Sequence, residues 1–67
     1  MERTNLKLLR VKNKMTQAEF AALIGCGRLA YMSIEKGKSA GRNIFWTSLQ
    51  RVFPHENIEE LKKVDEN

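Results

Sequence analysis

Cysteine, histidine and long apolar runs are scarce or missing in this sequence. Among its 67 residues there is one cysteine, Cys26, and one histidine, His55. A single cysteine excludes an intramolecular disulfide, and with a single histidine it supplies no metal-ligand cluster. No apolar stretch approaches the length of a membrane-spanning helix, and the N-terminus has no signal-peptide hydrophobic segment. The sequence therefore predicts a cytoplasmic protein that holds no metal and enters no membrane.

The residue pairs that carry catalysis are also missing. No carboxylate pair, nucleophile–base pair or phosphate-binding loop is evident, so we expect no enzyme activity, no cofactor and no small-molecule ligand. Cys26 has no histidine or second cysteine nearby and is expected to behave as a small buried hydrophobe. His55 follows Pro54 without partners and is expected to cap a helix at the surface.

The composition is sufficient for one small folded domain. Hydrophobic residues make up 42% of the chain, which supports a compact core and argues against disorder throughout. Residues 1–53 carry ten Lys/Arg against three Asp/Glu, a net +7. Residues 54–67 carry two bases against five acids, a net −3. The basic part is where a polyanion would bind, although a merely solvated basic surface has the same composition.

The most specific pattern lies in residues 15–37. It opens with Thr16-x-x-Glu19, the capping-box signature of a helix start. Three apolar residues then recur at helical spacing and predict the buried stripe of a helix over residues 17–24: Phe20, Leu23 and Ile24. Gly25 is expected to end this helix in a left-handed conformation, which glycine adopts without steric cost.

A second periodic segment follows after a short break. It predicts a helix over residues 28–36, with Tyr31 and Ile34 facing inward and Gly37 ending it. Two helices joined by so short a turn must cross steeply, and the small side chain of Ala21 permits the close approach of their backbones. This geometry is that of a helix-turn-helix unit, whose second helix can enter a DNA major groove.

These residues also carry a resemblance to a known family. The spacing resembles that of the phage repressor/Cro-type (XRE-like) helix-turn-helix proteins at Gln17, Ala21, Gly25, Ile34, Glu35 and Gly37. The resemblance extends back through Leu6-x-x-Leu9-Arg10 and covers roughly residues 4–53, with a poorer match after Lys38. It implies an all-α, compact five-helix repressor-like fold, with residues 1–67 forming one DNA-binding domain.

The resemblance implies that the second helix of the unit reads DNA bases. The matching positions are Gly27, Arg28, Leu29 and Ser33. We expect Arg28 to make the strongest contact, either bidentate to a guanine or to a phosphate, and Leu29 to contact a thymine methyl group. Ser33 can donate or accept a hydrogen bond and discriminates weakly between bases.

The resemblance also implies contacts with the DNA backbone and one internal ion pair. Gln17 would donate to a phosphate at the start of its helix, although a plain solvent-exposed role is open. In the polar loop over residues 36–43, three side chains are placed to join in, although the loop could equally be mobile and solvated without DNA: Lys38, Arg42 and Asn43. Arg10 is expected to pair with Glu35 in a structural role.

The sequence departs from the family pattern on the expected reading face. Gly27 replaces the usual Ser or Thr and therefore lacks a capping hydroxyl. Leu29 and Met32 are apolar where family members are mostly polar. A protein-interaction module, antirepressor-like or antitoxin-like, that uses these two residues and Trp46 is the alternative function.

The remaining helices are predicted from capping residues and apolar spacing. A first helix over residues 5–14 would be capped by Thr4 or Asn5 and bury Leu6 and Leu9, leaving Leu8 and Val11 exposed. A fourth, over residues 44–53, would close the core with its apolar residues, which are Phe45, Trp46, Leu49, Val52 and Phe53. A fifth, over residues 55–63, would present Ile58 and Leu61, and residues 64–67 would form a frayed acidic end.

Together these features predict a sequence-specific transcriptional regulator that binds double-stranded DNA. We expect a phage- or prophage-type repressor that blocks a promoter by occupying it. Because one small module reads few base pairs, we expect a homodimer on a pseudo-palindromic operator, formed in solution or only on DNA.

Overall fold

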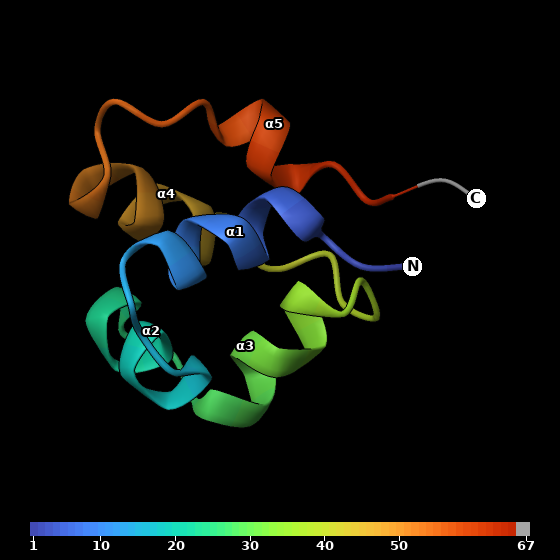
Figure 1. The fold of residues 1–67 in the computed structure, drawn as a ribbon, viewed down its shortest axis with the longest axis horizontal. Coiled ribbons are helices and arrows are strands. Elements are labelled where there is room, and N and C mark those ends of the chain that lie inside the picture. The colour runs from blue at the N-terminus through green and yellow to red at the C-terminus, as the bar shows by residue number, and fades with distance from the viewer. Residues whose placement is uncertain (66–67) are drawn as a thin grey trace.

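The chain folds into a short bundle of helices with no β-strand among the residues described. The computed structural model describes residues 1–65. These residues form five α-helices, which are α1 (Thr4–Lys12), α2 (Gln17–Ile24), α3 (Arg28–Glu35), α4 (Asn43–Val52) and α5 (Ile58–Lys62). Figure 1 shows α2 and α3 in the lower part of the view, α4 and α5 in the upper part, and α1 between them. The all-α five-helix prediction is confirmed.

One hydrophobic core joins all five helices. Its buried apolar residues are Leu6, Leu9, Phe20, Ala21, Ile24, Tyr31, Ile34, Phe45, Trp46, Leu49 and Leu61. The Phe20 ring lies between Tyr31, at a centroid distance of 5.2 Å, and Phe53, at 5.7 Å. Each helix is too short to be stable alone, so burial of this shared apolar surface is what stabilises them.

The start and the end of α2 follow the local signals in the sequence. The Thr16 hydroxyl accepts from the Glu19 amide at 3.1 Å, and the Glu19 carboxylate accepts from the Thr16 amide at 2.8 Å. Gly25 has φ +94° and ends the helix in the left-handed region. The Ala21 carbonyl accepts from the amides of both Gly25 and Cys26, which closes the turn toward α3. The predicted capping box and glycine end are confirmed.

The predicted apolar stripe of α2 is wrong at Leu23, which is 42% exposed. The buried face of α2 is formed by Phe20, Ala21 and Ile24. Because Ala21 faces inward against α3, the centre of the buried face is rotated away from Leu23. Val52 of α4 is also partly exposed for the same reason, since Phe45, Trp46 and Leu49 define that helix's inner face.

The predicted capping of α1 by Thr4 or Asn5 is also wrong. Arg3 occupies the N-cap position and makes no side-chain cap. The Thr4 hydroxyl donates instead to the Asp65 carboxylate, and the Asn5 amide donates to the Glu60 carbonyl. Both side chains therefore hold the C-terminal part of the chain against α1, a long-range use that local capping rules do not consider.

The C-terminal region differs from its prediction at both ends. Asn57, not His55, caps α5, with its side-chain oxygen accepting from the amides of Glu59 and Glu60. His55 is exposed in the turn before it. Asp65 is not frayed, since its amide donates to the Glu2 carbonyl at 2.8 Å. Residues 66 and 67 of the predicted frayed end lie outside the described residues.

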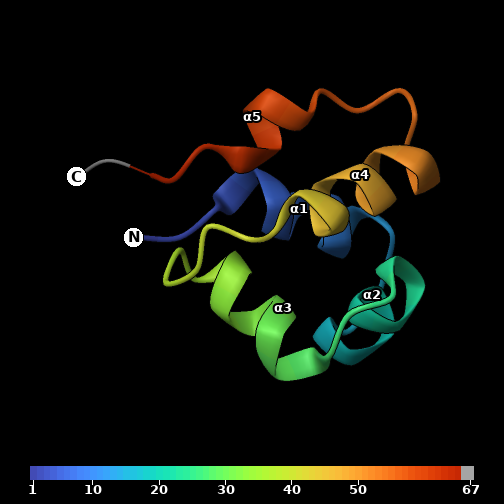
Figure 2. The same cartoon turned by 180° about the vertical axis from the view of Figure 1, so that it is seen from behind.

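The N-terminal segment and the described residues that follow α5 lie side by side, next to the loop that follows α3, as both views show (Figure 1 and Figure 2). Gly37 in that loop has φ +79°, and a side chain there would collide with the Met1 carbonyl. Within residues 1–65, none of the helices has the length and apolar character needed to cross a membrane.

Candidate nucleic-acid interface

Helix α3 lies at the edge of the fold and presents one face to solvent (Figure 1). Its buried residues are Tyr31, Ile34 and Glu35. Arg28 and Leu29 are exposed, with Leu29 at 71%. An α-helix with its side chains is about 10–12 Å in diameter, which fits the width of a DNA major groove, about 12 Å. The α3 outer face is therefore accessible and of a suitable size for a duplex.

The predicted base-reading positions fall on or beside this outer face. Gly27 is the exposed N-cap of α3, with no side chain to cap it. Arg28 and Leu29 occupy the first turn, where recognition helices contact bases. Ser33 is half-buried one turn later and lines a cleft with Gly41 and Arg42. The structure thus places three of the four positions at the open start of α3 and the fourth next to the following loop.

The electrostatics of this face favour an anion. Glu35 is the one acid among the described residues of α3, and it is 3% exposed. Lys36, Lys38 and Arg42, which follow α3 in the chain, are exposed. The positive side chains therefore reach solvent while the negative one is covered.

The loop over residues 36–42 has a defined path. The Ser33 carbonyl accepts from the amides of Lys38 at 2.9 Å and Ser39 at 3.2 Å. Further along, the Ala40 carbonyl accepts from the Trp46 indole nitrogen at 3.0 Å. Lys38 and Arg42 both belong to this loop, so its path sets their backbone positions relative to α3.

The start of α4 extends the same basic surface. Arg42 is its N-cap and makes no side-chain cap, and the helix begins at Asn43. The amides of the first turn of a helix have no partner within the helix, and the helix dipole is positive there. Arg42 and Asn43 are both exposed beside these amides. Such an arrangement can bind a phosphate group, whose oxygens accept hydrogen bonds from these donors.

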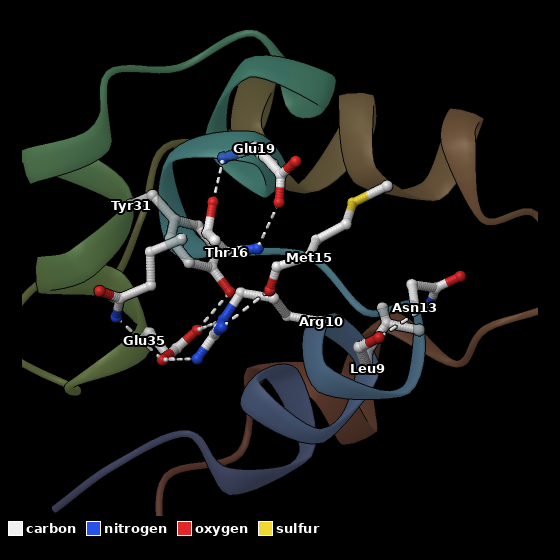
Figure 3. Close-up of polar contacts among 9 residues, drawn as sticks. Leu9, Arg10, Asn13, Met15, Thr16, Glu19, Tyr31 and Glu35 are labelled. Carbon is white, nitrogen blue, oxygen red and sulfur yellow. Dashed lines mark hydrogen bonds and ion pairs between the residues drawn. The ribbon is translucent and has the colours of Figure 1, made fainter.

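Behind α3, the buried carboxylate of Glu35 accepts hydrogen bonds from three side chains (Figure 3). Arg10 donates to Glu35 twice, from Nε to Oε2 at 2.9 Å and from Nη2 to Oε1 at 3.2 Å. Its Nη1 also donates to the Met15 carbonyl at 3.0 Å. The ion pair that the resemblance implies is thus bidentate, and it joins α1 to the end of α3 and to the segment that precedes α2.

Two further donors complete this network. The Tyr31 hydroxyl donates to Glu35 Oε2 at 2.5 Å, and Gln17 Nε2 donates to Glu35 Oε1 at 3.1 Å. Burial alone would raise the pKa of Glu35, but the hydrogen bonds from Arg10, Tyr31 and Gln17 bring its pKa below the ordinary value. Burial and the Glu35 carboxylate raise the pKa of Tyr31. Glu35 is therefore ionised at neutral pH and Tyr31 is protonated.

Gln17 lies at the first position of α2, where the resemblance implies a phosphate contact. One hydrogen of its side-chain amide is directed at Glu35, which fixes the orientation of the amide group. The other hydrogen is left for an external acceptor. Sequence reasoning did not foresee the link to Glu35, because the two residues are 18 positions apart.

Trp46 does not belong to an exposed apolar surface. It is 5% exposed, and its indole nitrogen is bonded to the Ala40 carbonyl. Trp46 is therefore not available to a protein partner, and the alternative function was wrong to include it. An apolar cleft of about 440 Å³ does lie between α3 and α4, with Ala30 and Ile44 in its walls. Cys26 also lines this cleft and is half-buried, and burial raises the pKa of its thiol.

Arg3 is a structural residue that the sequence did not reveal. The sequence offers it only as one of ten bases in residues 1–53, with no partner at a recognisable spacing. In the structure Arg3 is 6% exposed and donates to three backbone carbonyls from distant segments. A buried arginine of this kind has no local sequence signal, because its partners are backbone atoms.

Comparison with known proteins agrees with this geometry. A family model described as helix-turn-helix matches residues 6–40, which is more than half of the chain. The chain belongs to the Cro/XRE-like helix-turn-helix family, and it is therefore a DNA-binding regulatory domain. No curated protein and no solved structure matches it.

Proposed function

We propose that this protein is a sequence-specific repressor of the phage or prophage type, which binds its operator as a dimer and acts in the cytoplasm. The observation that carries the proposal is the α3 outer face, which is open, begins with Arg28, and has its only acid buried beneath it. Occupying a promoter requires nothing beyond binding, so occlusion is the simplest mode of repression.

In this proposal the first turn of α3 enters the major groove. Arg28 donates to O6 and N7 of a guanine, and Leu29 contacts a thymine methyl group. Ser33 lies one turn further along α3 and makes a weakly discriminating polar contact. Gly27 has no side chain, so its contribution is to let the helix start approach the DNA closely.

Backbone contacts flank the reading helix on both sides. On one side is the free amide hydrogen of Gln17, at the start of α2. On the other are Lys38, Arg42 and Asn43, near the start of α4. Contacts of this kind fix the register of the protein on DNA and carry no direct sequence information.

The size of the molecule supports a dimer on one face of the duplex. Its principal extents are 30 × 25 × 24 Å. Successive major grooves on one face of B-DNA are about 34 Å apart. Two copies can therefore occupy adjacent half-sites side by side with little distance between them, which suits a pseudo-palindromic operator.

The experiment that tests this function is selection from a random duplex pool at two salt concentrations. We expect an enriched motif with two related half-sites about one helical turn apart, and a weaker affinity at higher salt. A pool that stays random, with retention that depends only on salt, would contradict sequence-specific binding.

Single substitutions separate base contacts from backbone contacts. Arg28→Ala should cost about 1–3 kcal/mol on the selected sequence and relax the preference at one base pair. Lys38→Ala and Arg42→Ala should weaken binding on all sequences and lower the salt dependence. Arg51→Ala, an exposed arginine on α4, is the matched control and should have little effect. An equal loss on every sequence for Arg28→Ala would make Arg28 a backbone contact.

A second candidate function rests on the exposed apolar side chain of Leu29. In that case the α3 outer face binds a protein, as an antirepressor-like or antitoxin-like module would. Leu29→Gln separates the two: it should alter the base preference at one position if α3 reads DNA. It would leave DNA binding unchanged if Leu29 serves a protein partner.

A further inference from the structure

Arg3 is a buried cation that is held by carbonyl groups. Its Nη1 donates to the Ile34 carbonyl at 2.6 Å and to the Ser39 carbonyl at 2.8 Å, and its Nε donates to the Lys62 carbonyl at 3.0 Å. Among the ion pairs of residues 1–65, none involves Arg3. The guanidinium carbon lies 5.8 Å from the centre of the Trp46 ring.

The three carbonyls belong to three different parts of the fold. Ile34 is in the last turn of α3, Ser39 is in the middle of the loop over residues 36–42, and Lys62 is the last residue of α5. Two of them are therefore at helix C-termini, where the helix dipole is negative and favours a cation. This explains how a buried charge is stabilised without a carboxylate.

Trp46, whose ring lies next to the Arg3 guanidinium, holds the loop as well. Trp46 donates to Ala40 at 3.0 Å, one residue after the carbonyl that Arg3 binds. Gly41, the next residue, has φ +80°, and a Cβ atom there would lie 2.8 Å from the Trp46 indole nitrogen. Arg3 and Trp46 thus donate hydrogen bonds to the carbonyls of two successive loop residues, Ser39 and Ala40.

A lysine could not replace this arrangement. Arginine presents several donors in a fixed planar fork, whereas lysine carries one compact ammonium group on a flexible stem. The three carbonyls are reached here from two different nitrogens of the fork, Nη1 and Nε. An ammonium group can supply the positive charge but cannot reach all three carbonyls from one position.

We propose that Arg3 is a positioning residue for DNA binding, which holds the loop over residues 36–42 in the conformation that lets Lys38 and Arg42 reach the DNA backbone. This inference rests on the proposed function for its effect on DNA. It adds that the N-terminal segment and the end of α5, neither of which is among the proposed DNA contacts, support the backbone contacts.

The test compares Arg3→Lys and Arg3→Met with Arg51→Lys and Arg51→Met. The Arg51 pair matches each change in charge at an exposed position of α4. Far-UV circular dichroism first establishes that each variant is folded. Loop release is then measured by hydrogen exchange of the Lys38 and Ser39 amides and by the emission of Trp46, the only tryptophan in the sequence. Arg3→Lys keeps the charge and remains informative if Arg3→Met fails to fold.

We expect both Arg3 variants to raise the exchange rate of the two amides by about tenfold or more, since each hydrogen bond from the charged guanidinium stabilises the closed loop. Trp46 emission should shift toward that of a solvated indole. Affinity should fall on selected and unrelated duplexes alike, and the salt slope should decrease by about one for each phosphate that the variant no longer binds. The Arg51 variants should leave exchange and emission unchanged.

Several outcomes would overturn the inference. If Arg3→Lys behaves like the wild type in exchange and affinity, charge is sufficient and the fork does not position the loop. If the loop opens while DNA affinity is unchanged, the loop does not carry the backbone contacts. If the wild-type protein binds no duplex, the proposed function fails and the role of Arg3 toward DNA fails with it. The hydrogen-exchange measurement still shows, independently of DNA binding, whether Arg3 anchors the loop.

Discussion

The helix-turn-helix unit and the loop that follows it are held in place by different kinds of contact. In the unit, the decisive residues lie close together in the chain, as in the Thr16–Glu19 capping box and the Gly25 turn. In the loop over residues 36–42, they come from far away: Arg3 reaches Ser39 across 36 positions. The loop therefore depends on the whole fold, whereas the start and end of α2 depend on a few neighbours.

This difference matters because the two regions would make different contacts with DNA. In the proposed function, the unit presents Arg28 and Leu29 to the bases, and the loop presents Lys38 and Arg42 to the phosphates. Substitutions far from the proposed DNA-binding face should therefore lower the affinity for DNA, through the loop, more than they change the sequence preference, which depends on α3. The Glu35 network is the exception, since it ties the end of α3 to α1 through a residue 25 positions away.

The largest expected effect is that of Glu35→Gln, which breaks the long-range support of the unit. The change leaves Arg10 largely buried with no countercharge, and we expect it to lower the free energy of unfolding by about 3–5 kcal/mol. Urea denaturation followed by circular dichroism measures it. Glu2→Gln, at an exposed position, is the control and should change stability little. A loss below about 1 kcal/mol for Glu35→Gln would show that the ion pair is not structural.

Acid should reproduce the same effect in the wild type. Because the folded-state pKa of Glu35 is below its ordinary value near 4.5, its contribution to stability is complete above that pH. The contribution is lost as the pH falls below 4.5 and through the folded-state pKa. The stability gap between wild type and Glu35→Gln should therefore narrow on acidification, as denaturation curves at several pH values would show. A gap that is independent of pH would contradict this assignment.

Gly41→Ala should disturb the loop by about 2–4 kcal/mol, more than Gly25→Ala disturbs the unit. Both glycines have a positive φ, which costs an alanine about 1–2 kcal/mol. At Gly41 the new Cβ would also meet the Trp46 indole nitrogen at 2.8 Å, whereas at Gly25 nothing lies within 4 Å. Thermal or urea denaturation of both variants measures the difference. Equal losses would mean that Trp46 moves aside freely.

Tyr31→Phe removes one hydroxyl from the Glu35 network and keeps the ring in the core. We expect a loss of about 1.5–3 kcal/mol, the range for a hydrogen bond to a charged group. The pKa of Glu35 should rise toward its ordinary value, because one donor to its carboxylate is gone. Denaturation and titration of the Glu35 carboxyl carbon by NMR are the measurements. An unchanged pKa of Glu35 would mean that Tyr31 contributes packing alone.

Thr16→Ala has the smallest expected effect, because the capping box is local and solvent-exposed. The loss should be about 1 kcal/mol. Thr16→Ser keeps the hydroxyl and should restore most of it, as urea denaturation would show. A loss as large as that of Glu35→Gln would contradict the view that local capping matters less here than the buried network.

The sequence was sufficient where the deciding groups are neighbours or face the core. It predicted the cap at Thr16, the turn at Gly25, and the inward orientation of Tyr31 and Ile34. It misjudged Leu23, because the direction of the buried face of α2 depends on where α3 and α4 pack against it. The predicted DNA contacts at Arg28 and in the loop remain predictions.

By itself the sequence determined that there are five helices, that Gly25 ends α2 in a tight turn, and that residues 1–53 are basic. These follow from local hydrogen bonding, from the conformational freedom of glycine, and from the spacing of apolar side chains. Only the tertiary structure decided that Arg3 would be buried, that Gln17 would point one hydrogen at Glu35, and that Asp65 would return to the N-terminus. Those contacts join residues far apart in the chain, and several have a backbone carbonyl as the acceptor, which every residue possesses and no sequence pattern marks.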